Sequence, residues 1–188
     1  MPDSVLETPR LRLRRWRPGD LDLWLAHLNT PAVRACLGGV QSAEAVAEML
    51  ARTAREWDER GFSFLAVELR EDAAFLGTCG LARIDTPCAP EPLRGAVQIG
   101  WQLRADRWGH GYASEAAEAV LAMAFERFAM PMVYAQTSER NGRSWRVMQR
   151  LGMERLAGLD YHDPDYPAED NPTMVWGLER DCWHRAGA

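Results

Sequence analysis

The stretch WGHGYASEA, residues 108–116, places two glycines one residue apart between a segment that alternates like a strand and a segment with helical periodicity. A glycine-rich loop before a helix exposes backbone N–H groups that the helix itself cannot pair. Because the helix dipole adds positive potential at the same end, such a loop can bind an anion. The stretch therefore predicts an anion site at the start of a helix.

The segments on either side of this loop carry the two periodicities. In residues 96–103 (AVQIGWQL), every second side chain from Val97 to Leu103 is apolar, which is typical of a strand. After the loop, apolar residues recur at helical spacing from Ala117 to Phe128, and Ser114 is expected to cap this helix. The loop thus joins a predicted strand to a predicted helix.

The remaining segments predict mixed α and β elements within one domain, residues 1–188. A helix is expected to begin at Ser42 and end at Gly61, because serine favours N-caps and glycine favours helix ends. No internal repeat is visible. The other expected strands are residues 11–16, 62–69, 75–84, 132–138 and 173–179, and the other expected helices are residues 21–28 and 141–151.

Composition and charge exclude several classes of protein. The 188 residues are 47% hydrophobic, which is sufficient for a packed core. A net charge of -5, from 27 acidic and 22 basic residues, argues against a nucleic-acid partner or an anionic membrane surface and favours a cationic substrate. No run approaches the roughly 20 apolar residues of a membrane span, and the first residues lack a signal-peptide core, so a cytoplasmic location is expected.

The cysteines and histidines do not predict a metal site. Cys36, Cys79, Cys88 and Cys182 are far apart and form no C-x-x-C pair. A covalent route through a thiolate is also disfavoured, because Cys182 and His184 form the only close pairing and lie at the chain end.

Two familiar phosphate-binding motifs do not fit the loop. A P-loop requires a lysine followed by serine or threonine after its glycines, and none is present. A dinucleotide fingerprint would place its third glycine where Ser114 stands, and the next strand, residues 132–138, has no acidic ribose ligand. A nucleotide triphosphatase and a nicotinamide-dependent oxidoreductase are therefore disfavoured.

Three motifs in this order resemble the GNAT acyltransferases, in particular the branch with the Rim-type ribosomal-protein N-terminal acetyltransferases. They are LETPRLRLRRW (6–16), IGWQLRADRWGHGYASEA (99–116) and SERNGRSWRVMQRLGM (138–153). The resemblance covers almost the whole chain. It implies an α/β (α+β) fold with a mixed, mostly antiparallel sheet of six to seven strands and about four helices. The sheet is expected to splay between its fourth and fifth strands, here residues 96–103 and 132–138, to admit acetyl-CoA.

The resemblance also implies the residues that bind acetyl-CoA. The family pattern [QR]-x-x-G-x-[GA] falls on residues 108–113 and departs from it only at Trp108. Gly111 matters most physically, because a Cβ there would block the phosphates or resist a positive φ. The expected cofactor-binding residues are Trp101, Gln102, Leu103, Arg107, Trp108, Gly109, His110, Gly111, Tyr112, Ala113, Ser114, Asn141 and Ser144. Asn141 could equally be the cap of its helix, and Arg107 a solvated surface arginine.

The catalytic groups are less clear, because two usual family residues are replaced. An amine attacks a thioester only when it is unprotonated, so a base is needed. The glutamate frequent on the fourth strand is Gln98 here, and the tyrosine that protonates the thiolate is Met148. Ser144, or a water that it holds, is the substitute proton donor, and Glu68 is the candidate base. A backbone N–H near Gln102 is expected to polarise the thioester oxygen.

Residues 160–172 (DYHDPDYPAEDNP) are the candidate acceptor-binding loop, because the family places a loop beside the acceptor cleft at this point. The loop holds five carboxylates, two tyrosines and a histidine. A solvated acidic loop is the plainer interpretation; the alternative is a lid that collects a cationic amine. In the second case His162, Asp163 and Asp165 would bind substrate, and neutralising both aspartates would raise the acceptor KM. His162 could also serve as base or orienting group.

The sequence thus predicts transfer of an acetyl group from acetyl-CoA to a primary amine by direct attack in a ternary complex. The acceptor could be a protein N-terminal α-amine or a small-molecule amine, and the protein a monomer or a homodimer. The alternative is a non-catalytic acyl-CoA sensor of the same fold, since Gln98 and Met148 replace proton-transfer groups.

Overall fold

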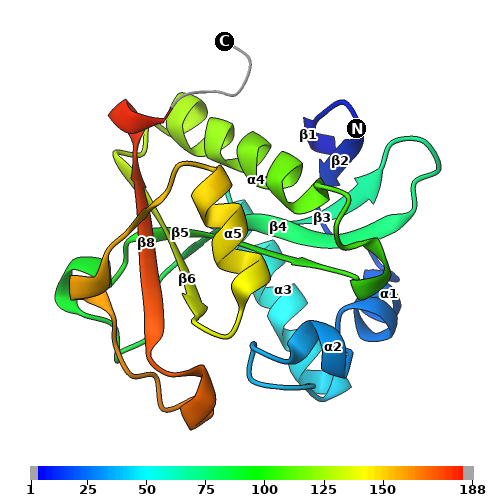
Figure 1. Cartoon of the computed structure of the whole chain (residues 1–188). Helices are drawn as coiled ribbons and strands as arrows, with labels where there is room; N and C mark the ends of the chain where they lie inside the picture. The colour runs from blue at the N-terminus through cyan, green and yellow to red at the C-terminus, as the bar shows by residue number, and fades with distance from the viewer. Residues whose placement is uncertain (1–3, 184–188) are drawn as a thin grey trace.

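The computed structural model describes residues 4–183, which form one mixed sheet with helices on both faces (Figure 1). The order of the strands is β1-β2-β3-β4-β5-β6-β8-β7. The eight strands are β1 (Ser4–Glu7), β2 (Leu11–Arg14), β3 (Phe64–Leu69), β4 (Phe75–Arg83), β5 (Val97–Leu103), β6 (Met132–Ser138), β7 (Glu154–Arg155) and β8 (Thr173–Glu179). The α-helices are α1 (Asp20–His27), α2 (Pro31–Arg34), α3 (Ala43–Arg60), α4 (Tyr112–Ala122) and α5 (Gly142–Arg150).

The predicted fold class is confirmed, and the element counts differ slightly. Over residues 4–183 the chain has eight strands and five α-helices, against the expected six to seven strands and about four helices. The additional elements are short: β1 has four residues, β7 two and α2 four. Segments of this length carry too few residues to show a periodicity. Ser42 and Gly61 begin and end α3 as predicted, with Ser42 accepting a hydrogen bond from the Ala45 N–H.

The pairing of β5 with β6 is the irregular point of the sheet. β4 pairs with β5 from Gly77↔Leu103 to Arg83↔Val97, and β6 pairs with β8 from Met132↔Glu179 to Ser138↔Thr173. Between the parallel strands β5 and β6, only Gln98↔Tyr134 is in register. The two strands therefore separate beyond Gln98. This is the splay expected between residues 96–103 and 132–138. They are the fifth and sixth strands because β1 adds one at the N-terminal edge.

The two faces of the sheet bury separate apolar clusters. On β3, Leu65 and Val67 face the cluster that contains Val120 and Leu121 of α4, whereas Ala66 faces the cluster that contains Trp24 of α1. This alternation follows from the two-residue period of a strand that is covered on both sides. Both faces near the centre of the sheet are thus occupied by helices.

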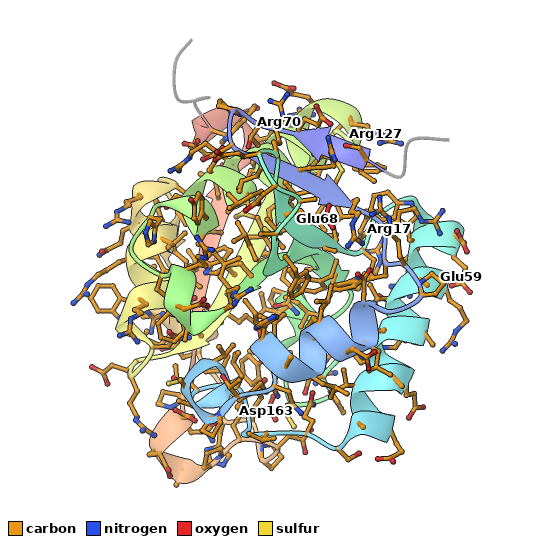
Figure 2. The ribbon with its side chains drawn as sticks, turned by 90° about the vertical axis from the view of Figure 1, so that its right-hand side faces the viewer. Arg17, Glu59, Glu68, Arg70, Arg127 and Asp163 are labelled. Carbon is orange, nitrogen blue, oxygen red and sulfur yellow. The ribbon has the colours of Figure 1, made fainter. Side chains whose placement is uncertain are left out.

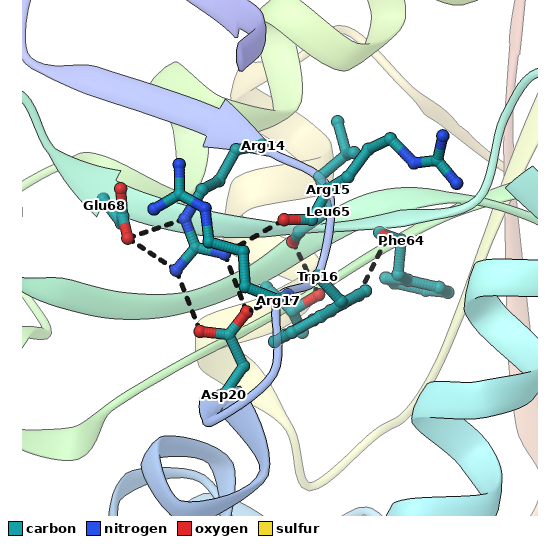
Figure 3. A network of polar contacts seen from close by, with 9 residues as sticks. Arg14, Arg15, Trp16, Arg17, Asp20, Phe64, Leu65 and Glu68 are labelled. Atoms are coloured by element: carbon teal, nitrogen blue, oxygen red, sulfur yellow. Dashed lines mark hydrogen bonds and ion pairs between the residues drawn. The ribbon is translucent and has the colours of Figure 1, made fainter. Parts of the chain in front are cut away.

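A buried ion-pair network joins β2, α1 and β3 (Figure 3). Arg14, 2% exposed, donates to both carboxylate oxygens of Asp20, at 2.7 and 2.9 Å, and through Nε to Oε1 of Glu68 at 2.7 Å. Burial alone would lower the pKa of Arg14, but the hydrogen bonds and charges of the two carboxylates outweigh it and raise this pKa. The guanidinium therefore stays charged and holds the three elements together.

Replacing Arg14 should destabilise the fold strongly. In Arg14→Met, two buried carboxylates lose their cation, so the free energy of unfolding should fall by roughly 3–5 kcal/mol in urea denaturation. Arg12→Met is the matched control, because Arg12 pairs with Glu7 at the surface and such pairs contribute about 0–1 kcal/mol. Equal losses in the two variants would contradict the structural role of Arg14.

Candidate active site

The predicted anion loop has the backbone conformation that its glycines permit. Gly109 has φ +82° and Gly111 has φ +80°, both in the left-handed region. Gly111 is the N-cap of α4, and no side chain caps this helix. The prediction that Ser114 is the cap is wrong: Ser114 lies inside the first turn, and its buried Oγ has no hydrogen-bond partner within residues 4–183.

The backbone N–H groups of this loop are unpaired. The first intrahelical bond runs from the Glu115 N–H to the Gly111 carbonyl, at 3.1 Å. In the described part of the chain, the N–H groups of residues 109–114 have no backbone acceptor. Together with the positive end of the helix dipole, these groups form a cradle for an anion.

Trp108 fixes the position of the loop. Its Nε1 donates to the Leu103 carbonyl at the end of β5, at 2.8 Å, and the Arg143 guanidinium from α5 stacks over its ring, 4.4 Å from the centroid. Trp108 also packs against both large apolar clusters. The residue that departs from the family pattern thus ties β5, the loop and α5 together. His110 and Tyr112 stack on each other at 5.6 Å on the exposed side of the loop.

Besides Arg143, three arginines lie close to the loop in the chain or in space, and two of them form ion pairs. Arg10 pairs with Glu115 at 2.6 Å, and Arg104 pairs with Asp106 at 2.7 Å. The Arg107 guanidinium has no hydrogen bond or ion pair to any residue in the range 4–183. Arg107 therefore has no competing ion pair among these residues, and its role in binding a phosphate stays a prediction.

Further residues that are predicted to bind the cofactor lie at the end of β5 and at the start of α5. Trp101 and Gln102 are half-buried at the end of β5 and Leu103 is buried; Oε1 of Gln102 is buried with no partner among the described residues. At the start of α5, the Asn141 side chain accepts from the Ser144 N–H at 3.3 Å, so Asn141 is a helix cap. Ser144 is half-buried in the same turn.

Met148 of α5 is 1% exposed and packs in the main cluster. No proton donor therefore stands where the family often has tyrosine. Cys182, from the discounted covalent route, is exposed, and His184 lies outside the described residues.

A cavity of about 230 Å³ lies near the other end of β5. It is bordered by the ends of β4, β6 and β8, by the segment after α2 and by the acidic loop of residues 160–172. Its lining is mostly polar and includes three carboxylates, two glutamines and two tyrosines, which are Asp85, Asp163, Asp170, Gln98, Gln136, Tyr161 and Tyr166. The cavity is therefore polar and acidic, and suits a small cationic molecule.

The acidic loop is only partly the solvated loop that the plainer interpretation predicts. His162 and Asp165 are exposed and do not line the cavity, whereas Asp163 and Asp170 are 6% and 3% exposed and do line it. Of the two candidate aspartates, only Asp163 therefore lines the cavity, while Asp165 is exposed to solvent. The sequence pattern did not single out Asp170, Tyr161 or Tyr166 as cavity residues. The one feature that pointed to them was the high density of carboxylates in residues 160–172.

Glu68 does not have the surroundings of a catalytic base. Its carboxylate is buried, is bound by Arg14 and does not line the cavity. Figure 2 shows Glu68 and Asp163 far apart, at the level of β3 and at the lower end of the molecule. We therefore assign Glu68 to the structural network and not to proton transfer.

Tyr161 is a hydrogen-bond donor inside the cavity. Its hydroxyl donates to Oε1 of Gln136 at 2.7 Å. Burial, followed by the charge of Asp163, raises its pKa to about 12. The pKa of Tyr166 is raised by the same two causes. Both phenols are consequently protonated at neutral pH.

The coupling between Asp163 and these phenols can be measured. Tyrosinate absorbance followed with pH should show a titration near pH 12 that Tyr161→Phe removes. Because a nearby negative charge disfavours the phenolate, Asp163→Asn should lower the pKa of Tyr161. Asp165→Asn should leave this titration close to that of the wild type. An unchanged titration in Asp163→Asn would show that this carboxylate does not act on the cavity.

Comparison with known proteins agrees with this geometry. Residues 10–154 match the acetyltransferase (GNAT) domain, and the chain belongs to this family. It is 26% identical over 157 residues to the uncharacterized N-acetyltransferase p20 of Bacillus licheniformis. This alignment covers 81% of this chain and 83% of p20. The fold matches an acetyltransferase from Agrobacterium tumefaciens with a TM-score of 0.74 and 26% identity, over 93% of both chains.

A further solved structure contains coenzyme A. The ribosomal L7/L12 α-N-protein acetyltransferase RimL in complex with coenzyme A has a TM-score of 0.74 and 17% identity to this chain. The match covers 95% of this chain and 99% of RimL. The family match over residues 10–154 and the similarity to N-acetyltransferases assign the chain to the acetyl-CoA-dependent acetyltransferases of the GNAT family, and RimL adds a likeness in fold.

No helix within residues 4–183 is both long and apolar enough to cross a membrane. Across the same residues, no three histidine, cysteine or acidic side chains are grouped so that they could hold a metal ion.

A bulky side chain at Gly111 should prevent coenzyme A binding without unfolding the protein. A Cβ built at Gly111 meets only Arg10 Nη2, at 3.5 Å, so the cost to the fold is mainly the positive φ, about 1–2 kcal/mol. In Gly111→Trp, the indole would occupy the side of the loop where the N–H groups are free. Titration calorimetry should detect no binding of acetyl-CoA.

Gly95→Trp is the matched control for this variant, because Gly95 has φ +73° and open space around its Cβ. It carries the same backbone strain and should bind acetyl-CoA as the wild type does. Wild-type affinity in Gly111→Trp would show that the phosphates bind elsewhere.

Proposed function

We propose that the protein transfers the acetyl group of acetyl-CoA to a primary amine by direct attack in a ternary complex. The observation that carries this proposal is the arrangement along β5. The unpaired N–H loop follows its C-terminal end, the acidic cavity lies near its start, and the gap to β6 opens between them. A thioester lying along β5 would thus be reached by an amine in the cavity.

The residues present fit coenzyme A at the first of these places. The pyrophosphate would accept hydrogen bonds from the N–H groups of residues 109–114, and the Arg107 guanidinium would add a positive charge. The pantetheine arm carries amides and would run along the part of β5 that has no strand partner, past Gln102 and Leu103 towards Asn141. Ser114 Oγ and Gln102 Oε1, buried and without partners among residues 4–183, are suitable polar contacts.

The reaction requires two proton movements. The amine nitrogen forms a bond to the thioester carbonyl carbon, the carbon–sulfur bond breaks, and the amine loses a proton while the thiolate gains one. Gln98 and Met148 cannot exchange these protons. We assign protonation of the thiolate to Ser144 or to a water that it holds, because its hydroxyl lies in the first turn of α5 beside the cap Asn141.

The size and charge of the cavity support a small or terminal amine as the acceptor. A volume of about 230 Å³ is below the range of drug-sized sites, so it admits a small amine or the first residue of a peptide. The sequence motifs favour the Rim-type branch, whose members acetylate peptide α-amines. The likeness to RimL, at 17% identity, concerns the fold alone.

A non-catalytic acyl-CoA sensor is the second candidate, and the replacements at Gln98 and Met148 favour it. The two candidates share the cofactor site and differ in turnover. Release of free coenzyme A from acetyl-CoA in the presence of an amine would exclude the sensor. Binding of acetyl-CoA without thiol release across a panel of peptide and small-molecule amines would exclude the enzyme.

The cofactor itself is tested by thermal unfolding with acetyl-CoA, coenzyme A and NADH in parallel. A ligand present at 100 times its Kd adds about 2.7 kcal/mol of stability. In a chain of this size that raises the unfolding midpoint by roughly 5–10 °C. A shift with both coenzyme A species and none with NADH is expected. No shift with acetyl-CoA would contradict the proposed function.

A further inference from the structure

Asp163 is a buried carboxylate that faces the acceptor cavity without a cation. It is 6% exposed and lines the cavity, and its Oδ1 accepts from the Asp165 N–H at 3.1 Å. Within residues 4–183, no arginine or histidine forms an ion pair with it. The nearby cation Arg34, which acts on Tyr166, donates instead to the carbonyls of Leu37 and Gly39.

The other poorly exposed carboxylates of the same loop are paired. Asp170 contacts Arg140 at 3.4 Å and accepts from Ser138, and Asp160 is bound by both nitrogens of the Arg155 fork. Asp163 therefore differs from its neighbours in the loop. A buried charge that lacks a partner is costly, and a cationic ligand would remove that cost.

A second unsatisfied group belongs to Gln136, which lines the same cavity. Nε2 of Gln136 is buried and has no acceptor among the described residues, while Oε1 of this amide is held by the Tyr161 hydroxyl. Buried polar groups in proteins are nearly always hydrogen-bonded. A cavity lined by a carboxylate without a cation and by a glutamine with an unused amide donor therefore suits a polar ligand.

A cation bound at Asp163 would not be the amine that reacts. A carboxylate beside an ammonium stabilises the charged form and raises the pKa of the amine, which opposes the deprotonation that attack requires. An aspartate also has an ordinary pKa of about 4, several units below that of an amine, so it removes the proton poorly. The arrangement fits an acceptor with two amino groups, one bound as a cation and one free to attack.

Resting on the proposed function, we propose that Asp163 is the specificity-determining residue for a small dicationic acceptor. Its carboxylate binds the distal ammonium group of a diamine, and the other amino group reaches the thioester at the gap between β5 and β6. The substrate class is therefore short aliphatic diamines. A monoamine of the same length can either pair its ammonium with Asp163 or present its amine to the thioester, but it cannot do both.

The test compares diamines with monoamines of equal length, such as 1,5-diaminopentane with 1-aminohexane, in the wild type and in Asp163→Asn. Asparagine can still accept from the Asp165 N–H, so this variant keeps the local turn and removes only the charge. Binding is measured by titration calorimetry with coenzyme A present, and turnover by thiol release from acetyl-CoA. Asp165→Asn, which neutralises an exposed carboxylate two residues away, is the control.

In the wild type, the diamine should be acetylated with a kcat/KM at least tenfold higher than that of the monoamine, because only the diamine can pair with Asp163 and still present an amine to the thioester. Asp163→Asn should reduce this ratio to about one and leave the KM for acetyl-CoA unchanged, while Asp165→Asn keeps the wild-type ratio. A wild type without preference, or a preference that survives in Asp163→Asn, would overturn the proposal. Diamine binding that depends on Asp163 without any thiol release would support the proposal while contradicting the proposed transfer reaction.

Discussion

The separation of β5 from β6 is the constraint on which the active site depends. The two strands share only the pair Gln98↔Tyr134, although each is fully paired on its other edge. Because a main chain inside a sheet needs partners for its N–H and C=O groups, the gap leaves β5 with unused hydrogen-bonding capacity. A cofactor with amides along its length can supply those partners, whereas another strand cannot enter.

Three of the buried polar groups without a hydrogen-bond partner in the described part of the chain come from the elements that border this gap, while Trp24, Gln41 and Trp176 hold others elsewhere. Gln102 on β5, Ser114 on α4 and Gln136 on β6 each have a buried atom without a partner among residues 4–183. The N–H groups of residues 109–114 add an unpaired anion cradle, and Asp163 adds an unpaired charge. Elsewhere, a buried charge such as Arg14 is matched by Asp20 and Glu68.

The parts of the site that depend on local sequence could be predicted, and the parts that depend on long-range contacts could not. The glycine loop and the Asn141 helix follow from chain-local properties, namely positive φ and helix capping. Ser114 failed as a predicted cap because Gly111 starts the helix three residues earlier. Which of Asp163 and Asp165 is buried is decided by the packing of the loop against β6 and β8. The pairing of Glu68 with Arg14 spans 54 residues, so no local pattern reveals it.

The most direct measurement of the central claim is an amide NMR titration of the protein with coenzyme A. We expect the backbone amide signals of residues 109–114 to shift most, because their N–H groups would bind the pyrophosphate, with further shifts along residues 100–103 of β5. Shifts that leave residues 109–114 unaffected while coenzyme A binds would contradict the account.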